Sequence, residues 1–467
     1  MKLAFHGAAR TVTGSKHLLT LNSGVQILLD CGMFQGMGGE TEELNKHWGF
    51  QPDTLDFLVL SHAHIDHSGL IPKLVKDGFS APIYCTPATY DLVALLLEDS
   101  AGIQEYETER LNRQRAESHL PPVEAMYDKE DVKRALALFQ TVDYDTPVEL
   151  GEQVTLRYTD AGHILGSASV HLRIREEGAE RTLTFSGDVG QYNSLILRSP
   201  QKFEQSDYII LESTYGNSLH KDGPLSYDEL LRFIKQTCVE NKGKLVIPSF
   251  SVGRTQQLLY DINKMYLEND LRAVEVFLDS PLSIEATEVT VNHPECFNKN
   301  VHKIMTRDDN PFEFPQLKFI RSVDESKALN YKKEPCVIIS ASGMADAGRV
   351  KHHIANNISN PANTILMVGY CAPGTFGAHL LEHPKEVTIY GKQYVVKAGI
   401  DSIRSMSAHG DYDDLCQYLA CQDPKAVDKL FLVHGEYEVQ QDFRDRLIKK
   451  GFADVIIPGM HEEIGLG

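Results

Sequence analysis

The most distinctive chemical feature of the sequence is the hexapeptide HAHIDH at positions 62–67, which directly follows the apolar run FLVL. Side chains two positions apart on an extended chain point to the same side, so His62 and His64 can bind one metal ion. A turn after them can direct Asp66 and His67 toward a second ion. A string of this kind arises by chance only about 0.002 times in a chain of this length. The hexapeptide therefore predicts a metal site rather than an ordinary polar loop.

Three other residues follow strand-like apolar runs in the same way: His163 in DAGH, Asp188 in SGD and His434 in LVHGE. Alone, a histidine at a strand end is more often structural than a ligand. Together with the hexapeptide they complete two sites, in which a carboxylate bridge would hold two ions roughly 3.5–4 Å apart and let a shared water lose its proton near neutral pH. The predicted zinc ligands are His62, His64 and His163 for one ion, and Asp66, His67 and His434 for the other, with Asp188 as the bridge.

The elements that position these residues show two different sequence patterns, one in each part of the chain. Up to about residue 208, short strands joined by Gly-containing turns predict a layered sheet, and residues 89–140 have the helical spacing of helices that cover it. From about residue 207, apolar runs of four to six residues alternate with a Ser/Gly turn and a helical pattern, as in KLVIPSFSVGRTQQLLYDINKMY. This repeat is typical of a parallel sheet with helices on its faces, so we predict a second α/β domain.

The ligand motifs, together with Asp30 in LLDCG, resemble those of the metallo-β-lactamase fold, in which two β-sheets face each other between outer helices. The resemblance implies an αββα sandwich in the α/β class. It also implies that Asp30 orients metal ligands from behind, as histidine ligands generally require. From its local sequence alone, Asp30 is equally well read as a turn-forming carboxylate.

The spacing of the ligands narrows the resemblance. Asp188 and His434 must meet at one site although 246 positions separate them, and no loop of a compact domain is that long. A whole domain must be inserted, and the chain resembles the β-CASP branch of the fold, whose added motifs match Glu212 in IILEST, His409 in SAHGD and His434. We therefore expect a metallo-β-lactamase domain at 1–208 and 395–467, and an inserted β-CASP domain of parallel-sheet type at 209–394.

The resemblance implies a ribonuclease, because a histidine at the last motif is typical of members that act on RNA. We predict a dinuclear zinc enzyme that hydrolyses single-stranded RNA, with Asp66 and Asp188 as metal-binding catalytic residues. His409 is the predicted general acid and Glu212 the residue that orients it. Without the resemblance, His409 and Glu212 would be read as an ordinary turn residue and a strand-end charge.

Two turns of the insertion, at 249–255 and 340–349, run from an apolar strand through small residues into a helix. Such turns leave backbone N–H groups available for an anion, although many are only structural. The predicted substrate-binding residues are Arg254, Ser340, Ser342, Gly343 and Arg349, with His352 and His353 as weaker candidates.

Composition limits the function classes. The formal net charge of −19 argues against a protein that coats nucleic acid by bulk attraction, so a polyanion must be held by local groups. The eight cysteines form no CxxC pair, and no apolar run is long enough to span a bilayer. We therefore expect a cytoplasmic protein with no membrane segment.

Two alternatives stay open. One is a small-molecule hydrolase on the same fold, which leaves the long insertion unexplained. The other is a non-catalytic scaffold of an RNA-processing complex, against which the complete ligand set speaks. The sequence does not distinguish endonuclease from 5′–3′ exonuclease action, nor does it identify the cellular RNA. Members of the branch often form homodimers, but the sequence has no readable interface pattern, and manganese would also accept these ligands.

Overall fold

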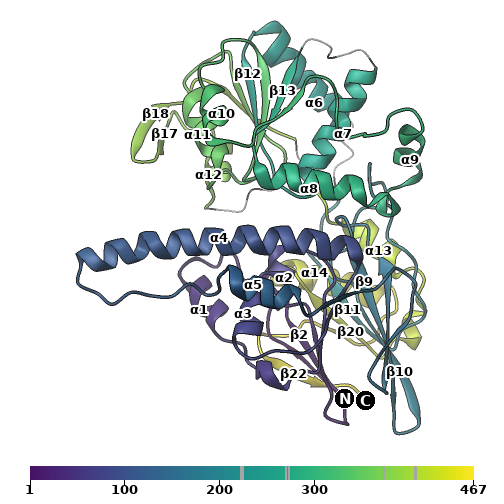
Figure 1. Cartoon of the computed structure of the whole chain (residues 1–467). Helices are drawn as coiled ribbons and strands as arrows, with labels where there is room; N and C mark the ends of the chain where they lie inside the picture. Colours follow the sequence, from purple (N-terminus) through teal and green to yellow (C-terminus); the bar gives the residue numbers. More distant parts are fainter. Residues whose placement is uncertain (221–225, 269–270, 272–273, 370, 372–373, 404–406) are drawn as a thin grey trace. The chain divides into compact units, whose positions relative to one another are not determined.

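The computed structural model describes residues 1–220, 226–268, 271, 274–369, 371, 374–403 and 407–467. The chain forms two compact units (Figure 1). The first unit comprises Met1–Leu219 and His409–Gly467, and the second comprises His220–Ala408. In the described ranges, no helix combines the length and the apolar character needed to cross a membrane.

The first unit contains two sheets, each with seven strands among the described residues. In spatial order, the strands of the first sheet are β22 (Glu462–Gly465), β1 (Lys2–Phe5), β2 (His17–Thr20), β3 (Gln26–Leu29), β4 (Phe57–Val59), β5 (Ile83–Cys85) and β6 (Phe139–Thr141). Those of the second sheet are β21 (Val455–Ile456), β20 (Lys429–Val433), β11 (Tyr208–Glu212), β10 (Ala179–Phe185), β9 (Ala168–Glu176), β8 (Val154–Asp160) and β7 (Val148–Leu150).

The two sheets pack face to face over one apolar core. Leu3 and Phe5 of β1 and Leu172 of β9 belong to a single buried cluster with Phe431 of β20. The rings of Phe5 and Phe431 lie 5.2 Å apart between centroids. The alternating burial along β9 is the period-two pattern of a strand with one face in the core.

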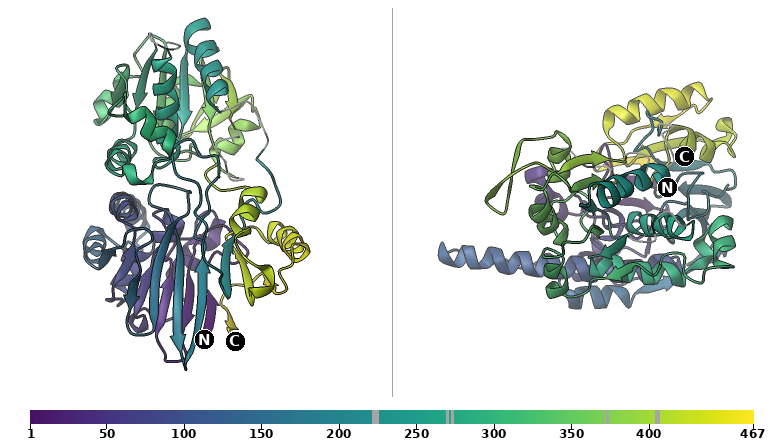
Figure 2. Two further views of the ribbon diagram at one scale, coloured as in Figure 1. Left: turned by 90° about the vertical axis from the view of Figure 1, so that its right-hand side faces the viewer. Right: turned by 90° about the horizontal axis from the view of Figure 1, so that it is seen from above.

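Helices cover the outer faces of both sheets (Figure 2, left). On the first sheet these are α1 (Thr41–Lys46), α2 (Ile65–Ser68), α3 (Ile71–Lys76), α4 (Pro87–Glu117) and α5 (Lys129–Leu136). On the second sheet, α13 (Tyr412–Leu419) and α14 (Tyr437–Lys449) pack their buried residues against β11 and β20. The arrangement is the predicted αββα sandwich.

The second unit is built on a parallel sheet, as predicted. Its strands, in spatial order, are β14 (Leu317–Phe319), β13 (Glu275–Leu278), β15 (Cys336–Ser340), β12 (Lys244–Pro248), β16 (Thr364–Met367) and β19 (Gly399–Ser402). Its helices are α6 (Ser226–Ile234), α7 (Arg254–Leu267), α8 (Pro281–Asn292), α9 (Lys299–Met305), α10 (Val323–Ala328), α11 (Arg349–Asn357) and α12 (Phe376–Leu381). All five residues of β15 are buried, as expected of a central parallel strand.

The units divide later along the chain than the expected boundaries at 208 and 394. Strand β11 pairs in parallel with β20 and so belongs to the first unit, whereas β19 pairs in parallel with β16 and so belongs to the second. A hairpin of β17 (Glu386–Ile389) and β18 (Lys392–Val395), which we did not expect, also lies in the second unit. Strand pairing between residues far apart in sequence decides these limits, and local pattern does not show it.

The inter-sheet core yields a stability prediction. Phe431→Ala should lower the free energy of unfolding by about 3–5 kcal/mol, because it leaves a cavity where the two sheets meet. Urea unfolding followed by circular dichroism measures the change. Leu120→Ala is the control, because the Leu120 side chain is 51% exposed. If the two variants unfold at a similar urea concentration, the inter-sheet packing described here is wrong.

Candidate metal centre

The predicted ligands lie in loops that directly follow strands of both sheets in the first unit. The hexapeptide follows β4 of the first sheet, and its last three residues, from Ile65, begin helix α2. His163 and Asp188 follow β8 and β10 of the second sheet, and His434 follows β20. Residues from both ends of the sequence therefore meet at one edge of the sandwich.

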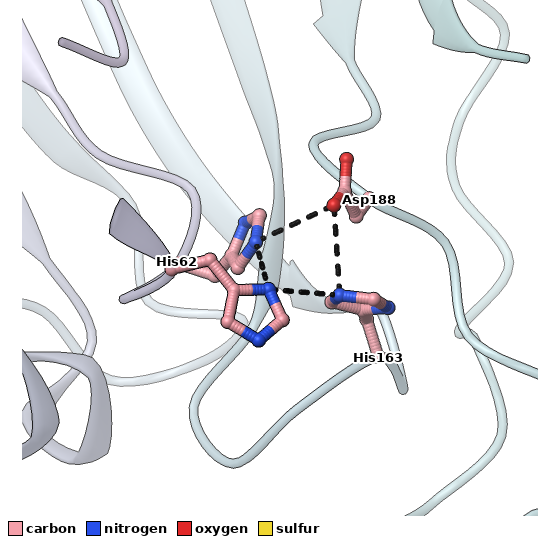
Figure 3. Close-up of side chains that lie close together, drawn as sticks. His62, His163 and Asp188 are labelled. Atoms are coloured by element: carbon pink, nitrogen blue, oxygen red, sulfur yellow. Dashed lines mark hydrogen bonds and ion pairs between the residues drawn. The ribbon is translucent and has the colours of Figure 1, made fainter. Parts of the chain in front are cut away.

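Four of the residues form a first group with donor atoms close enough to share one ion. His64 Nδ1 lies 3.2 Å from His62 Nε2 and 3.2 Å from His163 Nε2. Asp188 Oδ2 lies 3.5 Å from both His62 Nε2 and His163 Nε2. Figure 3 shows the side chains of His62, His163 and Asp188 pointing toward one another.

A second group consists of Asp66, His67 and His434. The other oxygen of Asp188, Oδ1, faces this group, at 3.3 Å from His67 Nε2 and 3.5 Å from His434 Nδ1. Asp66 Oδ2 lies 3.4 Å from His434 Nε2. The two oxygens of one carboxylate thus face two different groups of ligands, which is the arrangement expected of a bridge between two ions.

Buried atoms without hydrogen-bond partners show that these side chains fit a cation. His67 donates from Nδ1 to Asp30 Oδ2 at 2.6 Å, and its Nε2 faces Asp188 Oδ1 at 3.3 Å. Among the described side chains, neither His67 Nε2 nor Asp188 Oδ1 has a hydrogen-bond partner. Burial lowers the pKa of His67, but Asp188 and Asp30 raise it more, to well above its ordinary value. A cation bound between His67 Nε2 and Asp188 Oδ1 would replace the proton that this raised pKa favours and would leave the imidazole neutral.

The electrostatics suit neutral imidazole ligands and ionised carboxylates. Burial lowers the pKa of His62 and His163 well below the ordinary value and that of His64 to about 4. Burial raises the pKa of Asp66, but His434 and neighbouring imidazoles lower it more, to about 2. Asp188 has its pKa held well below the ordinary value in the same way. These are the ionisation states in which histidine and aspartate bind a divalent cation.

Asp30 lies behind the ligands and is fully buried. Its Oδ1 accepts from the Ser61 N–H at 2.7 Å, and its Oδ2 accepts from Ser61 Oγ at 2.8 Å and from His67 Nδ1. Ser61 Oγ also lies 3.0 Å from His62 Nδ1. Burial raises the pKa of Asp30. The carboxylate therefore sets the orientation of His67 directly and that of His62 through Ser61, as the predicted supporting role requires.

Glu212 and His409 form a pair beside the first group. The Glu212 side chain is fully buried, and its Oε1 lies 3.1 Å from His409 Nδ1. The same carboxylate accepts from the backbone N–H of Val189, next to Asp188, at 2.8 Å. Burial lowers the pKa of His409, but Glu212 and Asp188 raise it more, to about 9. Glu212 therefore fixes the ring of His409 beside the metal ligands and favours its protonated form.

The loop between β1 and β2 joins the two ends of the site. The His434 N–H donates to Ala8 O at 2.7 Å, and the Ser15 N–H donates to Asp66 O at 2.8 Å. The fully buried ammonium of Lys16 donates to Gly14 O at 3.0 Å and Gly32 O at 2.8 Å. Burial lowers the pKa of Lys16 to about 7. This loop holds the backbones of Asp66 and His434 in place together.

Two features of the site were not predicted. One is the β1–β2 loop, whose single residue of a ligand type, His6, lies against His461 and not at the site. The other is Thr214, whose Oγ1 lies 3.0 Å from His434 Nδ1. Thr214 directly follows the strand-like run IILES, two residues beyond Glu212, and this position is the sequence feature that could have indicated its role.

The predicted substrate-binding residues lie in the second unit. The turns run from β12 into α7 and from β15 into α11, as expected. Arg254 is buried and pairs with Gln257. Ser342 Oγ lies 3.3 Å from Ala347 O, and a Cβ on Gly343 would come within 2.6 Å of the Phe250 ring.

In the second of these turns the polar groups have protein partners. Arg349 Nη1 lies 2.7 Å from Asp279 Oδ1, and Ser340 Oγ donates to Asp279 O at 2.7 Å. His353 is buried, with Nε2 2.5 Å from Asp279 Oδ2, whereas His352 is exposed. Arg349 and Ser340 therefore hold the turn around a buried aspartate, and their proposed contact with substrate has no support from this geometry.

Three family descriptions match successive parts of the chain. They are the metallo-beta-lactamase superfamily at residues 18–236, the Beta-Casp domain at 255–380, and the Zn-dependent metallo-hydrolase RNA specificity domain at 393–458. Similar proteins match along nearly the whole length. Ribonuclease TTHA0252 of Thermus thermophilus is 34% identical over 94% of each chain. The chain belongs to the β-CASP family of metallo-hydrolases.

Other relatives agree with this assignment. An RNase J-like protein of Methanocaldococcus jannaschii is 32% identical, over 93% of this chain and 92% of its own. Transcription termination factor FttA of the same organism is 31% identical, over 96% of this chain and 70% of its own. A crystal structure of an Enterococcus faecalis protein of unknown function matches all of this chain with a TM-score of 0.53 at 12% identity, which shows the shared fold.

The supporting contacts of Asp30 yield a prediction for metal binding by this β-CASP protein. Asp30→Asn should weaken zinc binding about 10- to 100-fold, because an amide cannot accept all four of the hydrogen bonds that Asp30 accepts. Competition with a chromogenic zinc chelator measures the affinity. Asp53→Asn, an exposed aspartate of the same unit, is the control. Equal affinities for both variants would show that Asp30 has no part in metal binding.

Proposed function

We propose that this protein is a ribonuclease that binds two zinc ions and hydrolyses phosphodiester bonds of single-stranded RNA. The observation that carries the proposal is the Asp188 carboxylate, whose two oxygens face two separate groups of metal-binding side chains. The full-length similarity to proteins named as ribonucleases supports RNA as the substrate. Whether cleavage is internal or proceeds from a 5′ end is left to experiment.

The proposed ligands divide as in the two groups described. His62, His64 and His163 would hold the first ion, and Asp66, His67 and His434 the second, with Asp188 shared. Bound in this way, zinc supplies positive charge for the non-bridging phosphate oxygens and lowers the pKa of water. Burial keeps His62 and His163 neutral, so the positive charge at the first group would come from its ion.

His409 is the proposed general acid. Glu212 holds its Nδ1, so that proton donation to the leaving oxygen would use Nε2. Hydrogen bonds from the backbone N–H groups of Val189 and Thr214 hold the Glu212 carboxylate itself. A second reading makes His409 a metal ligand, because its ring also lies within reach of Asp188. Zinc content separates the two readings, since a general acid can be removed without loss of metal.

The alternatives from sequence receive less support. A small-molecule hydrolase would not need the second unit, and the similarity to ribonucleases extends across that unit. A scaffold would tolerate loss of ligands, and here every predicted ligand lies in one of the two groups. We also propose a cytoplasmic location, and we leave homodimer formation open.

Zinc content and substrate range test the proposal. The purified protein should contain about two zinc ions per chain by mass spectrometry, and should cleave labelled single-stranded RNA but neither single-stranded DNA nor a chromogenic lactam. Asp66→Ala should keep about one zinc ion and lose RNA cleavage, because Asp66 belongs to the second group alone.

Each opposite outcome has a clear meaning. Zinc-loaded protein that leaves RNA intact would refute the ribonuclease. Hydrolysis of the lactam instead would favour the small-molecule enzyme. Retention of both ions by Asp66→Ala would refute the proposed division of ligands.

The general acid is tested by a different variant. His409→Ala should reduce kcat for RNA about 10²- to 10⁴-fold while keeping both zinc ions. Glu212→Gln should give a smaller loss of kcat, because glutamine keeps the side-chain shape but not the charge that favours protonated His409. Loss of zinc from His409→Ala would identify His409 as a ligand instead.

A further inference from the structure

The second unit carries an exposed group of aromatic and basic side chains that no part of the proposed chemistry uses. It consists of residues from α11, α12 and the β17–β18 hairpin, which projects from the body of its unit beside these helices (Figure 1). We call it the aromatic–lysine face, and its members are Lys351, His352, Phe376, Tyr390, Lys392 and Tyr394.

Two rings of this face, Tyr390 and His352, are exposed and stacked on each other, whereas Phe376 and Tyr394 are partly buried against the core of the unit. Tyr390, at the turn of the hairpin, is 60% exposed. Its ring stacks on His352 with the centroids 4.6 Å apart and the planes 24° from parallel. The hairpin is anchored from beneath, because Val387 and Ile389 are buried in the core of the second unit. A firmly held strand pair therefore presents an exposed ring, which lowers the entropy cost of stacking another ring on it.

Lysines lie over and beside the rings. Lys351 Nζ is 5.4 Å from the centroid of Phe376 and 5.6 Å from that of Tyr390. Lys392 Nζ is 5.3 Å from the centroid of Tyr394. Lys351 Nζ also donates to Asp346 O at 3.1 Å. Both ammonium groups therefore lie next to an aromatic surface.

Charge at this face differs in sign from the chain as a whole. The hairpin and its flanks, residues 384–397, contain three lysines and one glutamate, Glu386, whereas the chain has a net charge of −19. The Glu386 side chain accepts a hydrogen bond from Gln393. A polyanion would be repelled by most of an acidic surface and attracted here.

We propose that the aromatic–lysine face binds single-stranded RNA through stacking of unpaired bases on Tyr390 and contact of Lys351 and Lys392 with phosphates. Exposed rings alternating with basic groups are the combination that recognises single strands, since a base-paired duplex offers no free base faces. The inference rests on the proposed function, and it adds a binding site for RNA outside the metal centre.

Binding of a labelled RNA to the zinc-loaded protein tests whether the aromatic–lysine face is an RNA site. The probe is a fluorescein-labelled, phosphorothioate-linked RNA of about 20 nucleotides, longer than the roughly 4–16 nucleotides that one such surface covers and resistant to hydrolysis. By fluorescence anisotropy, Tyr390→Ala should raise the Kd about tenfold, and Tyr390→Phe should keep the wild-type Kd because the ring remains. The same RNA annealed to its complement should show no difference between these variants.

The contribution of the two lysines is tested by the salt dependence of RNA binding. Lys351→Ala and Lys392→Ala should each reduce the slope of log Kd against log salt by about 0.7, the value for one phosphate contact on a single strand. Tyr390→Ala should leave that slope unchanged. The controls are Tyr331→Ala and Lys333→Ala, exposed residues of the same unit outside the face, with Tyr331 84% exposed.

The outcomes separate this inference from the proposed function. If the wild type cleaves RNA and Tyr390→Ala binds it as tightly as Tyr331→Ala does, the face is not an RNA site although the ribonuclease stands. If the wild type neither binds nor cleaves RNA, both proposals fail. If Tyr390→Ala instead changes the sedimentation mass with no change in Kd, the face is a protein contact and the inference is overturned.

Discussion

The geometry of the candidate metal centre depends on one buried carboxylate, that of Asp188. Asp188 has one oxygen toward His62 and His163 and the other toward His67 and His434, at 3.3–3.5 Å in every case. Such a charge without a cation or a proton nearby would be very costly to bury. Burial keeps His62 and His163 neutral, whereas at His67 burial is outweighed by Asp188 and Asp30, which raise the pKa well above its ordinary value, so of these three imidazoles only His67 is favoured in its charged form. Bound metal cations would supply the positive charge that the neutral imidazoles of the first group lack.

The surrounding backbone accepts strain to hold that geometry. Asp30 and His434 both have positive φ angles, of 59° and 51°, although neither is a glycine. Each such residue costs on the order of 1 kcal/mol or more and persists only where other contacts determine it. Those contacts are present: the Asp30 N–H donates to Val59 O and the His434 N–H to Ala8 O. Two of the non-glycine residues with positive φ are therefore residues of the candidate metal centre.

The insertion of a whole unit is compatible with this rigid centre because of strand pairing. Strands β11 and β20 lie next to each other in parallel, with Glu212 opposite Val433, although the whole second unit lies between them in sequence. The chain leaves the first unit shortly after Glu212 and returns at His409, whose Nδ1 meets that same glutamate. The pair that we propose for proton transfer therefore also joins the exit and the return of the chain.

Local sequence determined the types of the elements, the residues that gather at the candidate metal centre and the need for an inserted domain. It could do so because the hydrophobic period, the residue chemistry and the gap between Asp188 and His434 are properties of the sequence itself. Only the folded structure decided which strands pair, and hence that β11 and β19 move the unit limits away from 208 and 394. It also decided that Arg349 serves a buried aspartate and that Tyr390 stands exposed beside lysines. These features arise from contacts between segments far apart in sequence, whose free energy no local pattern contains.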